Sequence, residues 1–419
     1  MLLKNKKILL GVTGSIAAYK ACEIARLFIK AGASVQVVMS EAAARFVSPL
    51  TFEALTRNPV LCEGSESWAS NLNHIEISKD CDMFLIAPAT ANTINKLSKG
   101  IADNILLQSA LAFNKQVAIA PSANTNMLNN HHTKNSLKML SVSDITIIEP
   151  QEKLLACGDT GSGALADPQE IFWQCSKVLL RDPFWTDRRV VVTGGGTIEK
   201  IDDVRYISNF SSGKMANAIA TALYLKGADV CLIRTKEAKD LPNDIYTINV
   251  ESADEMLGFT EDALRVARKG VMSKPSLNNP DAIGMIQKEP FLFMVAAVAD
   301  YAPSYPQSGK IKKNMIGESW NIELKQNPDI LKTINKEGIK TVAFKAETDS
   351  DNGLANAMSL LDTKGADAVC YNLISDTNNF GGDDNEIIWI TANEQLKIDK
   401  QDKLSLAFKI LENAKRLSV

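Results

Sequence analysis

The chain has 419 residues, of which 45% are hydrophobic and 23% charged, and its formal net charge is −3. The composition is ordinary for a globular protein, and the length exceeds what one hydrophobic core usually supports, so we expect two domains. The balanced charge and the lack of a long basic run argue against a nucleic-acid or anionic-membrane partner. No apolar run approaches the roughly 20 residues that a membrane span needs.

Cysteine and histidine usage narrows the chemistry that the chain can perform. The seven cysteines include no CxxC pair, which favours reduced thiols in a cytoplasmic protein over a structural zinc site. All three histidines, His74, His131 and His132, lie in the first third of the sequence. Whatever reaction the remaining two thirds perform, they cannot use an imidazole of their own.

The first half alternates predicted strands and helices. Residues 6–12 are a short β-rich run, and residues 15–32 have helical apolar spacing that stops at Gly32. A further helix is predicted at 168–180. Apolar runs entered from polar segments are typical of a parallel sheet covered by helices on both faces, and they predict buried strands at 34–40, 83–90, 116–123 and 144–150.

The same pattern restarts after the turn-rich segment 181–187. Residues 188–197 repeat the strand and glycine turn, and residues 211–233 repeat the helix, glycine stop and second strand. The polar stretch 268–290 is interpreted as a surface excursion. Two doubly wound, three-layer α/β domains are therefore expected. Later strands are predicted at 291–301, 339–347, 366–374 and 385–391.

Two strand-to-helix turns in the front half have the composition of a ligand site. Gly14 and Ser15 lie where a helix N-terminus can bind a phosphate, although this turn alone is as often plain turn geometry. Thr90, Asn92 and Thr93 form a second polar turn. Both turns should meet at the carboxyl edge of the sheet, and the absence of GxGxxG favours a mononucleotide such as FMN over a dinucleotide.

Three further residues could take part in catalysis, although each also has a purely structural interpretation. His74, in NHIEI before a strand-like segment, is on sequence alone more often a surface or core histidine. Asn124 follows a predicted strand and is more often a turn asparagine. Cys157 lies in the glycine-rich segment ACGDTGSG, which favours an exposed lid with a reactive tip over a buried inert thiol.

The motifs GVTGSIAAYK, NHIEIS, LIAPATANT, PSANTNM and ACGD resemble, in order and spacing, the phosphopantothenoylcysteine decarboxylase family. The resemblance covers about residues 5–180 and implies a flavodoxin-like domain that binds FMN near a subunit boundary within trimers. It implies that His74 is the active-site histidine, Asn124 the carboxylate-binding asparagine and Cys157 the reactive lid cysteine. The expected FMN-binding residues are Gly14, Ser15, Ser40, Thr90, Asn92 and Thr93.

These residue types suit the implied reaction. A cysteine carboxylate has no electron sink, and oxidation of the thiol to a thioaldehyde by FMN creates one. His74 is suited to the opening proton removal and Cys157 to the later proton donation. Asn124 can orient the carboxylate without adding charge. The sequence departs from the family at Ala123, where methionine is usual, and at Leu128, where tryptophan is usual.

The back half carries a different set of motifs. The glycine turn 194–196 and the helix start 211–214 lie in one loop, which favours a nucleotide site somewhat over turn geometry. Lys310, Lys312 and Lys313 follow a predicted strand; such runs are usually solvated, but lysines can also neutralise a triphosphate.

Together VRYISNFSSGKM, AAVADY, KIKK, KQNPDI and FKAET resemble phosphopantothenate–cysteine ligase over about 188–410. The resemblance implies a Rossmann-like domain that forms dimers and activates the 4'-phosphopantothenate carboxylate with CTP and Mg2+ as an acyl-cytidylate, which L-cysteine then attacks. It implies that Asn209 lies at this intermediate and that Lys310 is needed for its formation or breakdown. The expected nucleotide-binding residues are Ala296, Asp300, Lys310, Phe344 and Lys364.

The two resemblances predict a bifunctional homo-oligomer, a dodecamer by family resemblance, with domains at 1–182 and 188–419. Lys345 replaces the usual alanine beside the nucleotide, so a preference for CTP over ATP is inherited from the family. Two alternatives are a flavin-binding regulatory protein without activity and a pair of NAD-dependent dehydrogenases. An intact ACGD motif argues against the first, and the missing GxGxxG with a histidine-free back half argues against the second.

Overall fold

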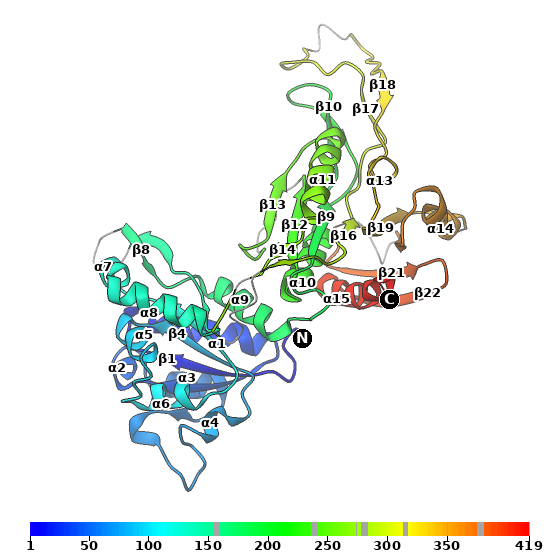
Figure 1. Cartoon of the computed structure of the whole chain (residues 1–419). Coiled ribbons are helices and arrows are strands. Elements are labelled where there is room, and N and C mark those ends of the chain that lie inside the picture. The colour runs from blue at the N-terminus through cyan, green and yellow to red at the C-terminus, as the bar shows by residue number, and fades with distance from the viewer. Residues whose placement is uncertain are drawn as a thin grey trace. The chain divides into compact units, whose positions relative to one another are not determined.

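The chain folds into two compact units, Met1–Leu180 with Ser273–Gly284, and Arg181–Met272 with Met285–Val419 (Figure 1). Each unit has a largely parallel sheet with helices on both faces, which confirms the predicted α/β architecture. Cys157 and Lys313 lie outside the described residues. The computed structural model describes residues 1–154, 160–235, 241–273, 275–277, 284–312, 317–349, 351–374 and 381–418.

The sheet of the front unit is fully parallel in the order β3-β2-β1-β4-β5-β6. Without the two-residue edge strand β3, this is the flavodoxin-like order. The order reverses between β1 and β4, the switch point at which doubly wound sheets bind ligands. The strands are β1 (Lys7–Val12), β2 (Ser34–Met39), β3 (Val60–Leu61), β4 (Met83–Ala89), β5 (Gln116–Pro121) and β6 (Thr146–Ile147).

Helices cover both faces of this sheet because its residues alternate between two cores. Leu10 and Leu85 pack with α1 and α9, whereas Leu9 and Phe84 pack with α5 and α6. The helix α1 ends just before Gly32, whose φ of +94° suits glycine. The helices are η1 (Ile16–Tyr19), α1 (Lys20–Lys30), α2 (Glu41–Ala44), α3 (Pro49–Thr56), η2 (Glu63–Ser65), α4 (Glu76–Lys79), α5 (Ala91–Leu97), α6 (Ile105–Ala112), α7 (Thr125–Asn129), α8 (His131–Val142) and α9 (Pro168–Leu180).

Two predicted strands of the front half differ from the structure. The strand-like segment after His74 is the one-turn helix α4, because the buried Asn73 side chain accepts from the N–H groups of Ile75 and Glu76. The strand predicted at 144–150 is reduced to β6. The excursion 268–290 pairs β14 (Val271–Met272) with β15 (Met285–Ile286), and its tip groups with the front unit.

The sheet of the back unit has the order β13-β12-β9-β16-β19-β20-β21-β22. The first six strands are parallel, in the order of a Rossmann sheet, and β21 and β22 add an antiparallel edge. Its switch point lies between β9 and β16. The strands are β9 (Arg189–Gly194), β12 (Asp229–Arg234), β13 (Tyr246–Asn249), β16 (Phe291–Met294), β19 (Lys340–Glu347), β20 (Ala368–Leu373), β21 (Asp384–Ile390) and β22 (Gln395–Asp402).

Helices α10 and α15 pack together, and α11, α13 and α14 bury their apolar residues in the core that contains Val191 and Leu292. Two small hairpins extend from the sheet, β10 (Ile198–Lys200) with β11 (Tyr206–Ser208), and β17 (Tyr301–Pro303) with β18 (Leu324–Gln326). The helices are α10 (Lys214–Leu225), α11 (Ala253–Ala267), α13 (Ile330–Thr333), α14 (Gly353–Thr363), α15 (Lys403–Ala414) and η3 (Lys415–Ser418).

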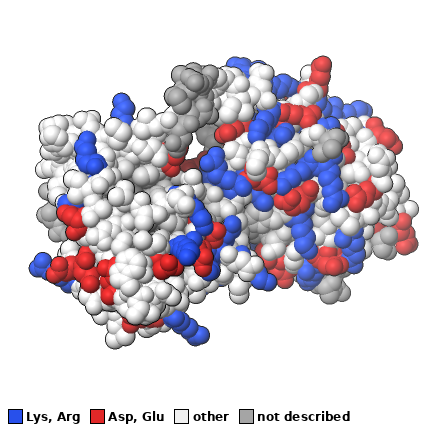
Figure 2. All heavy atoms as spheres, turned by 60° about the horizontal axis from the view of Figure 1, so that its bottom comes forward, with Lys and Arg blue, Asp and Glu red and all other residues white. Residues whose placement is uncertain are grey.

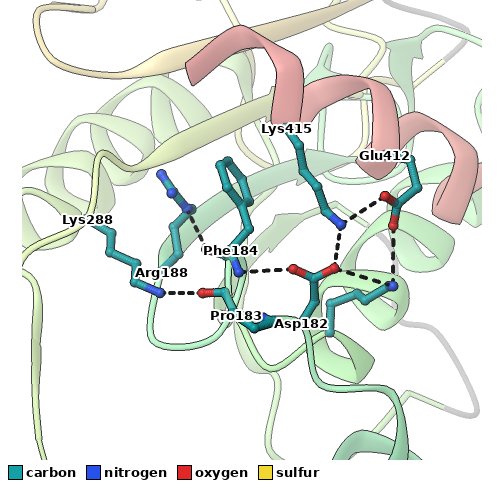
Figure 3. A network of polar contacts seen from close by, with 8 residues as sticks. Asp182, Pro183, Phe184, Arg188, Lys288, Glu412 and Lys415 are labelled. Carbon is teal, nitrogen blue, oxygen red and sulfur yellow. Dashed lines mark hydrogen bonds and ion pairs between the residues drawn. The ribbon is translucent and has the colours of Figure 1, made fainter. Parts of the chain in front are cut away.

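The turn-rich segment 181–187 is fixed to the back unit by polar contacts (Figure 3). The Asp182 carboxylate accepts hydrogen bonds from Lys415 Nζ and from the Phe184 N–H. Lys288 Nζ donates to the Pro183 carbonyl at 2.7 Å. The Trp185 side chain is fully buried. The segment therefore starts the back unit and is not a loose linker.

Basic and acidic side chains are intermixed on the face of the molecule that Figure 2 shows. Within the described part of the chain, no helix combines the length and the apolar character needed to span a membrane.

Candidate active sites

The front site forms where β1, β4 and β5 end side by side. Thr13, at the end of β1, is buried, and its hydroxyl donates to the Pro88 carbonyl at 2.6 Å and accepts from the Thr90 N–H at 3.1 Å. Ser15 Oγ lies 3.2 Å from Ser122 Oγ, which follows β5. The sequence predicts two polar turns here, and these contacts between strand ends hold them next to each other.

Most of the predicted flavin-binding side chains also cap helix starts. Ser15 accepts from the Ala17 N–H, Ser40 from Ala43 and Thr90 from Thr93. Asn124 Oδ1 accepts from Asn126 at 2.9 Å. Serine, threonine and asparagine favour such positions because their side chains satisfy free backbone N–H groups. Capping therefore contributes to the choice of residue, and the same turns also line the cavity described next.

A cavity of about 1220 Å³ opens at this edge of the sheet. Its wall includes every predicted flavin-binding residue (Gly14, Ser15, Ser40, Thr90, Asn92 and Thr93), together with Asn124 and Ala123. A Cβ atom at Gly14 would lie 2.5 Å from the Ala42 Cβ, so only glycine lets α2 approach the turn this closely. Sequence reasoning missed Glu63, Asn104, Ser122 and Lys153 on the wall; only Ser122, in a polar turn after a strand, carried a signal.

One side of the cavity is closed by the hairpin of β7 (Gln151–Leu154) and β8 (Thr160–Ala164). Asp167 anchors this hairpin by accepting from Lys153 and Gln151, both at 3.0 Å. Burial alone would raise the pKa of Asp167, but these hydrogen bonds lower it below its usual value. The hairpin also lies against the loop that holds Asn124, because a Cβ atom at Gly163 would be 2.0 Å from the Ala123 carbonyl oxygen.

His74 does not line the cavity of the single chain. It lies on the loop between η2 and α4, where its Nδ1 is 2.8 Å from Glu66 Oε1 and its ring meets the edge of the Trp68 ring. The cavity wall includes Glu63, at the start of the same loop. The structure thus brings Asn124 to the turns predicted to bind flavin and leaves His74 apart from them.

The back site begins in the segment 295–300 that follows β16. The sequence predicted a strand through residue 301, but β16 ends at Met294 because the next residues bond to the glycine turn. The Ala297 N–H donates to the Gly195 carbonyl at 2.8 Å, and the Ala299 N–H donates to Thr197 Oγ1 at 2.9 Å. Asn209 Nδ2 donates to the Val298 carbonyl at 2.9 Å. Asn209 is thereby held at this segment.

A second cavity, of about 190 Å³, lies between this segment and β19. Its wall includes Ala296, Asp300, Phe344 and Lys364, four of the residues predicted to bind a nucleotide. Lys345 also contributes and forms an ion pair of 3.1 Å with Glu347. Asp329, which lies in the KQNPDI motif but was assigned no role from the sequence, pairs with Lys364 in the wall.

Lys310 lies outside this cavity, on the exposed segment between β17 and β18. Its neighbours tie the segment to the β10–β11 hairpin, because the Gly309 N–H donates to Asp203 at 2.7 Å and the Ile311 N–H donates to Asp202 at 3.1 Å. A hydrogen bond from Arg205, above all, holds the pKa of the buried Asp202 well below its usual range. Within one chain, Lys310 and the cavity lined by the other predicted nucleotide-binding residues are therefore separate features.

Lys214, at the start of α10, is paired rather than solvated. Its Nζ lies 2.6 Å from Asp383 Oδ1 and 2.9 Å from the Gly381 carbonyl. It shares a small cavity of about 90 Å³ with Ser211, Ser212 and Lys403. The predicted anion-binding helix start thus combines N–H groups with two lysines, one of which, Lys403, was not anticipated.

Comparison with known proteins finds relatives that cover both units. Residues 2–179 match the family model of the flavoprotein domain, and residues 185–274 and 280–417 match the C-terminal domain of DNA/pantothenate metabolism flavoproteins. Three bacterial relatives share the name coenzyme A biosynthesis bifunctional protein CoaBC. Those of Vibrio parahaemolyticus (34% identity, 99% of each chain), Haemophilus influenzae (36%, 97% of this chain and 96% of the relative) and Bacillus subtilis (36%, 100% and 98%) all align along almost the whole chain.

These relatives match the chain in length and are more than 30% identical to it along nearly all of it. Both units are therefore assigned to the same protein family. The chain belongs to the family of bifunctional coenzyme A biosynthesis enzymes, with a flavoprotein domain in front of the pantothenate-metabolism domain.

Proposed function

We propose that the back unit joins 4'-phosphopantothenate to L-cysteine with CTP, and that the front unit decarboxylates the resulting 4'-phosphopantothenoylcysteine to 4'-phosphopantetheine. The observation that carries the proposal is the cavity at the ends of β1, β4 and β5, which collects every predicted flavin-binding residue and Asn124. Both reactions then take place on one cytoplasmic chain.

The front cavity fits FMN. Its volume exceeds the roughly 300–1,000 Å³ of ordinary ligand pockets, which leaves room for a substrate beside the flavin. The glycine at position 14 and the N–H groups at the start of η1 suit the phosphate, and Thr90, Asn92 and Thr93 offer further polar groups in the cavity wall. When bound, FMN supplies the two-electron oxidation that turns the cysteine thiol into an electron sink for decarboxylation.

The protein's own residues supply binding and proton transfer. Asn124 orients the substrate carboxylate from the loop after β5, and an uncharged amide lets the carboxylate leave as CO2. Cys157, from the segment between β7 and β8, donates the proton that completes the product. His74 removes the thiol proton at the start of the reaction.

Assembly completes the front site, since His74 lies apart from the cavity of its own chain. Ile16 and Tyr19 border the cavity, yet 59% and 62% of their surfaces are exposed, which supports an interface over the cavity mouth. We propose that the front units form trimers in which His74 serves the cavity of a neighbouring copy. Dimers of back units then make a dodecamer.

In the back unit, the carboxylate of phosphopantothenate is a poor electrophile. It takes the cytidylyl group from CTP with release of pyrophosphate, and the amine of cysteine then displaces CMP to form the amide. Ala296, Asp300, Phe344 and Lys364 bind the nucleotide, and Asn209 holds the acyl-cytidylate. Lys310 neutralises phosphate charge once its segment meets the nucleotide.

Mg2+ enters this scheme with the nucleotide. Among the described residues, no group of three or more histidine, cysteine, aspartate or glutamate side chains is arranged to hold a metal ion. Mg2+ commonly keeps water and phosphate ligands and takes one or two carboxylates from the protein, and Asp300 in the cavity wall is placed to be one.

One assay tests both halves. Purified chain is given 4'-phosphopantothenate, cysteine, Mg2+ and either CTP or ATP, and CO2 and 4'-phosphopantetheine are measured. We expect yellow protein and both products with CTP, and Asn209→Asp should stop CO2 release from phosphopantothenate but not from preformed phosphopantothenoylcysteine. A colourless protein that refuses added FMN would refute the assignment of the front unit.

A further inference from the structure

The loop that carries His74 has a fixed shape. Ser67 and Leu72 exchange two backbone hydrogen bonds of 2.8 and 3.0 Å, which close residues 67–72 into a small hairpin. At its beginning, Ser65 Oγ donates to the Val60 carbonyl at 2.9 Å. At its end, Asn73 is buried and accepts two backbone N–H groups of α4. Both ends of the loop that carries His74 are therefore anchored in the front unit.

Two side chains of this loop hold the imidazole itself. Glu66 Oε1 lies 2.8 Å from His74 Nδ1, and the side chains are 28% and 25% exposed, so water only partly competes for the contact. The Trp68 ring stands at 88° to the imidazole with ring centres 5.7 Å apart. Among the residues that the structure describes, none forms a hydrogen bond with His74 Nε2.

The chemistry of this pair sets the tautomer of the ring. An ionised carboxylate only accepts hydrogen bonds, so the nitrogen that faces Glu66 must carry the proton. The other nitrogen, Nε2, then keeps its lone pair, which no described residue engages in a hydrogen bond. The same arrangement in other enzymes makes an imidazole a proton acceptor with one defined direction.

We propose that Glu66 is the positioning residue of the decarboxylase, which holds His74 as the Nδ1–H tautomer with Nε2 ready to accept the substrate thiol proton. This inference rests on the proposed role of His74. In the step concerned, the thiol S–H bond breaks, its proton bonds to Nε2, and the electron pair stays on sulfur. The carboxylate of Glu66 keeps its charge and stabilises the imidazolium that forms.

The test uses the full chain and preformed 4'-phosphopantothenoylcysteine. Glu66→Ala should lower kcat of decarboxylation by about 10–100-fold, the usual effect of losing a hydrogen-bond partner of a functional histidine, with KM within about twofold of the parent. Glu66→Gln keeps the shape of the side chain and should also lower kcat, because an amide can donate to Nδ1 and move the proton to Nε2. Glu76→Gln, at a partly exposed carboxylate on α4 that pairs with Lys79, is the matched control and should leave kcat unchanged.

Two readouts separate positioning from a merely structural role. Flavin absorbance and the ligase rate of the same preparation should stay at parent values, since Glu66 contacts neither the flavin-binding turns nor the back unit's cavity. Added formate should restore part of the rate of Glu66→Ala and none of the rate of His74→Gln.

Unchanged kcat in both Glu66 variants beside an inactive His74→Gln would overturn the inference and leave the proposed function intact. Loss of flavin together with kcat, without rescue by formate, would also overturn it in favour of a structural role. Full activity of His74→Gln would instead remove His74 from the proposed mechanism.

Discussion

The ammonium group of Lys364 lies 2.8 Å from the Asp329 carboxylate in the wall of the back unit's cavity. Asp329 also caps α13 by accepting from the Lys332 N–H at 3.1 Å. Burial alone would raise the pKa of Asp329, but hydrogen bonds from Lys364 and from this N–H lower it. Asp329 therefore stays ionised and holds the lysine at the cavity.

This contact makes Lys364 a test of the nucleotide site. Lys364→Gln should raise the KM for CTP about 10-fold or more, because a charge-assisted hydrogen bond to phosphate contributes about 1.5–3 kcal/mol. Lys364→Arg keeps a cation that can pair with Asp329 and should stay closer to the parent. Decarboxylation of preformed substrate serves as the internal control. An equal rise with the exposed Lys397→Gln variant would mean that the effect is not local.

Gly14 gives a test of the flavin site. A Cβ atom there would lie 2.5 Å from the Ala42 Cβ, so Gly14→Ala must push α2 away from the turn. We expect at least a 10-fold loss of FMN affinity, about 1.4 kcal/mol, measured by flavin absorbance after dialysis. Gly64→Ala is the matched control, because no heavy atom lies within 4 Å of its added Cβ. Equal flavin content in the two variants would contradict the assigned phosphate turn.

The two sheets, and the edge of each sheet at which a ligand is expected, were predictable from sequence because apolar runs and glycine turns are local signals. The buried run at 83–90 became β4, and the turns at Gly14 and Thr90 meet at the switch point as expected. Doubly wound topology alone brings such turns together. The local pattern was therefore sufficient for this part of the site.

Features that depend on contacts between residues far apart in the sequence could not be predicted. The segment 295–300 looks like a strand, but its N–H groups bond to the glycine turn and to Thr197. Glu66 and Lys403 have no motif, and only the fold shows what they contact. His74 lies outside the cavity of its own chain because of the path that its loop takes, and a local sequence pattern does not show that path.

Ala123 gives a test of the substrate pocket. It lines the front cavity at a position where related decarboxylases usually have methionine. Ala123→Met should lower the KM for phosphopantothenoylcysteine about 3–10-fold, since each buried methylene contributes about 0.8 kcal/mol. Flavin content should not change. A higher KM would show that the hairpin packed on the Ala123 carbonyl leaves no room for the longer side chain.

The Asp182–Lys415 contact predicts how the stability of the back unit depends on pH (Figure 3). Burial alone would raise the pKa of Asp182, but hydrogen bonds from Lys415 and the Phe184 N–H lower it. Burial would lower the pKa of Lys415, but hydrogen bonds to Asp182 and Glu412 raise it. The carboxylate's contribution is therefore complete above its unfolded pKa of about 3.9 and is lost as the pH falls through the lower folded pKa.

The ammonium's contribution has the opposite dependence: it is complete below about pH 10.4 and is lost as the pH rises through the raised folded pKa. At pH 7 both are present, and Asp182→Asn should cost about 1.5–3 kcal/mol. The difference from the parent should shrink as the pH falls below about 4. Urea unfolding followed by tryptophan fluorescence, to which the buried Trp185 and Trp389 of the back unit contribute, measures this difference.

The exposed pair Asp262–Arg265 supplies the control, because both side chains are about two-thirds exposed. Asp262→Asn should change the free energy of unfolding by at most about 0.5 kcal/mol at any of these pH values. If Asp182→Asn cost as little as this at pH 7, the segment 181–187 would be held by its other contacts, such as the buried Trp185 and the hydrogen bond from Lys288, and not by this ion pair. If its cost stayed constant down to pH 2, the lost stability would come from packing around Asp182 and not from its charge.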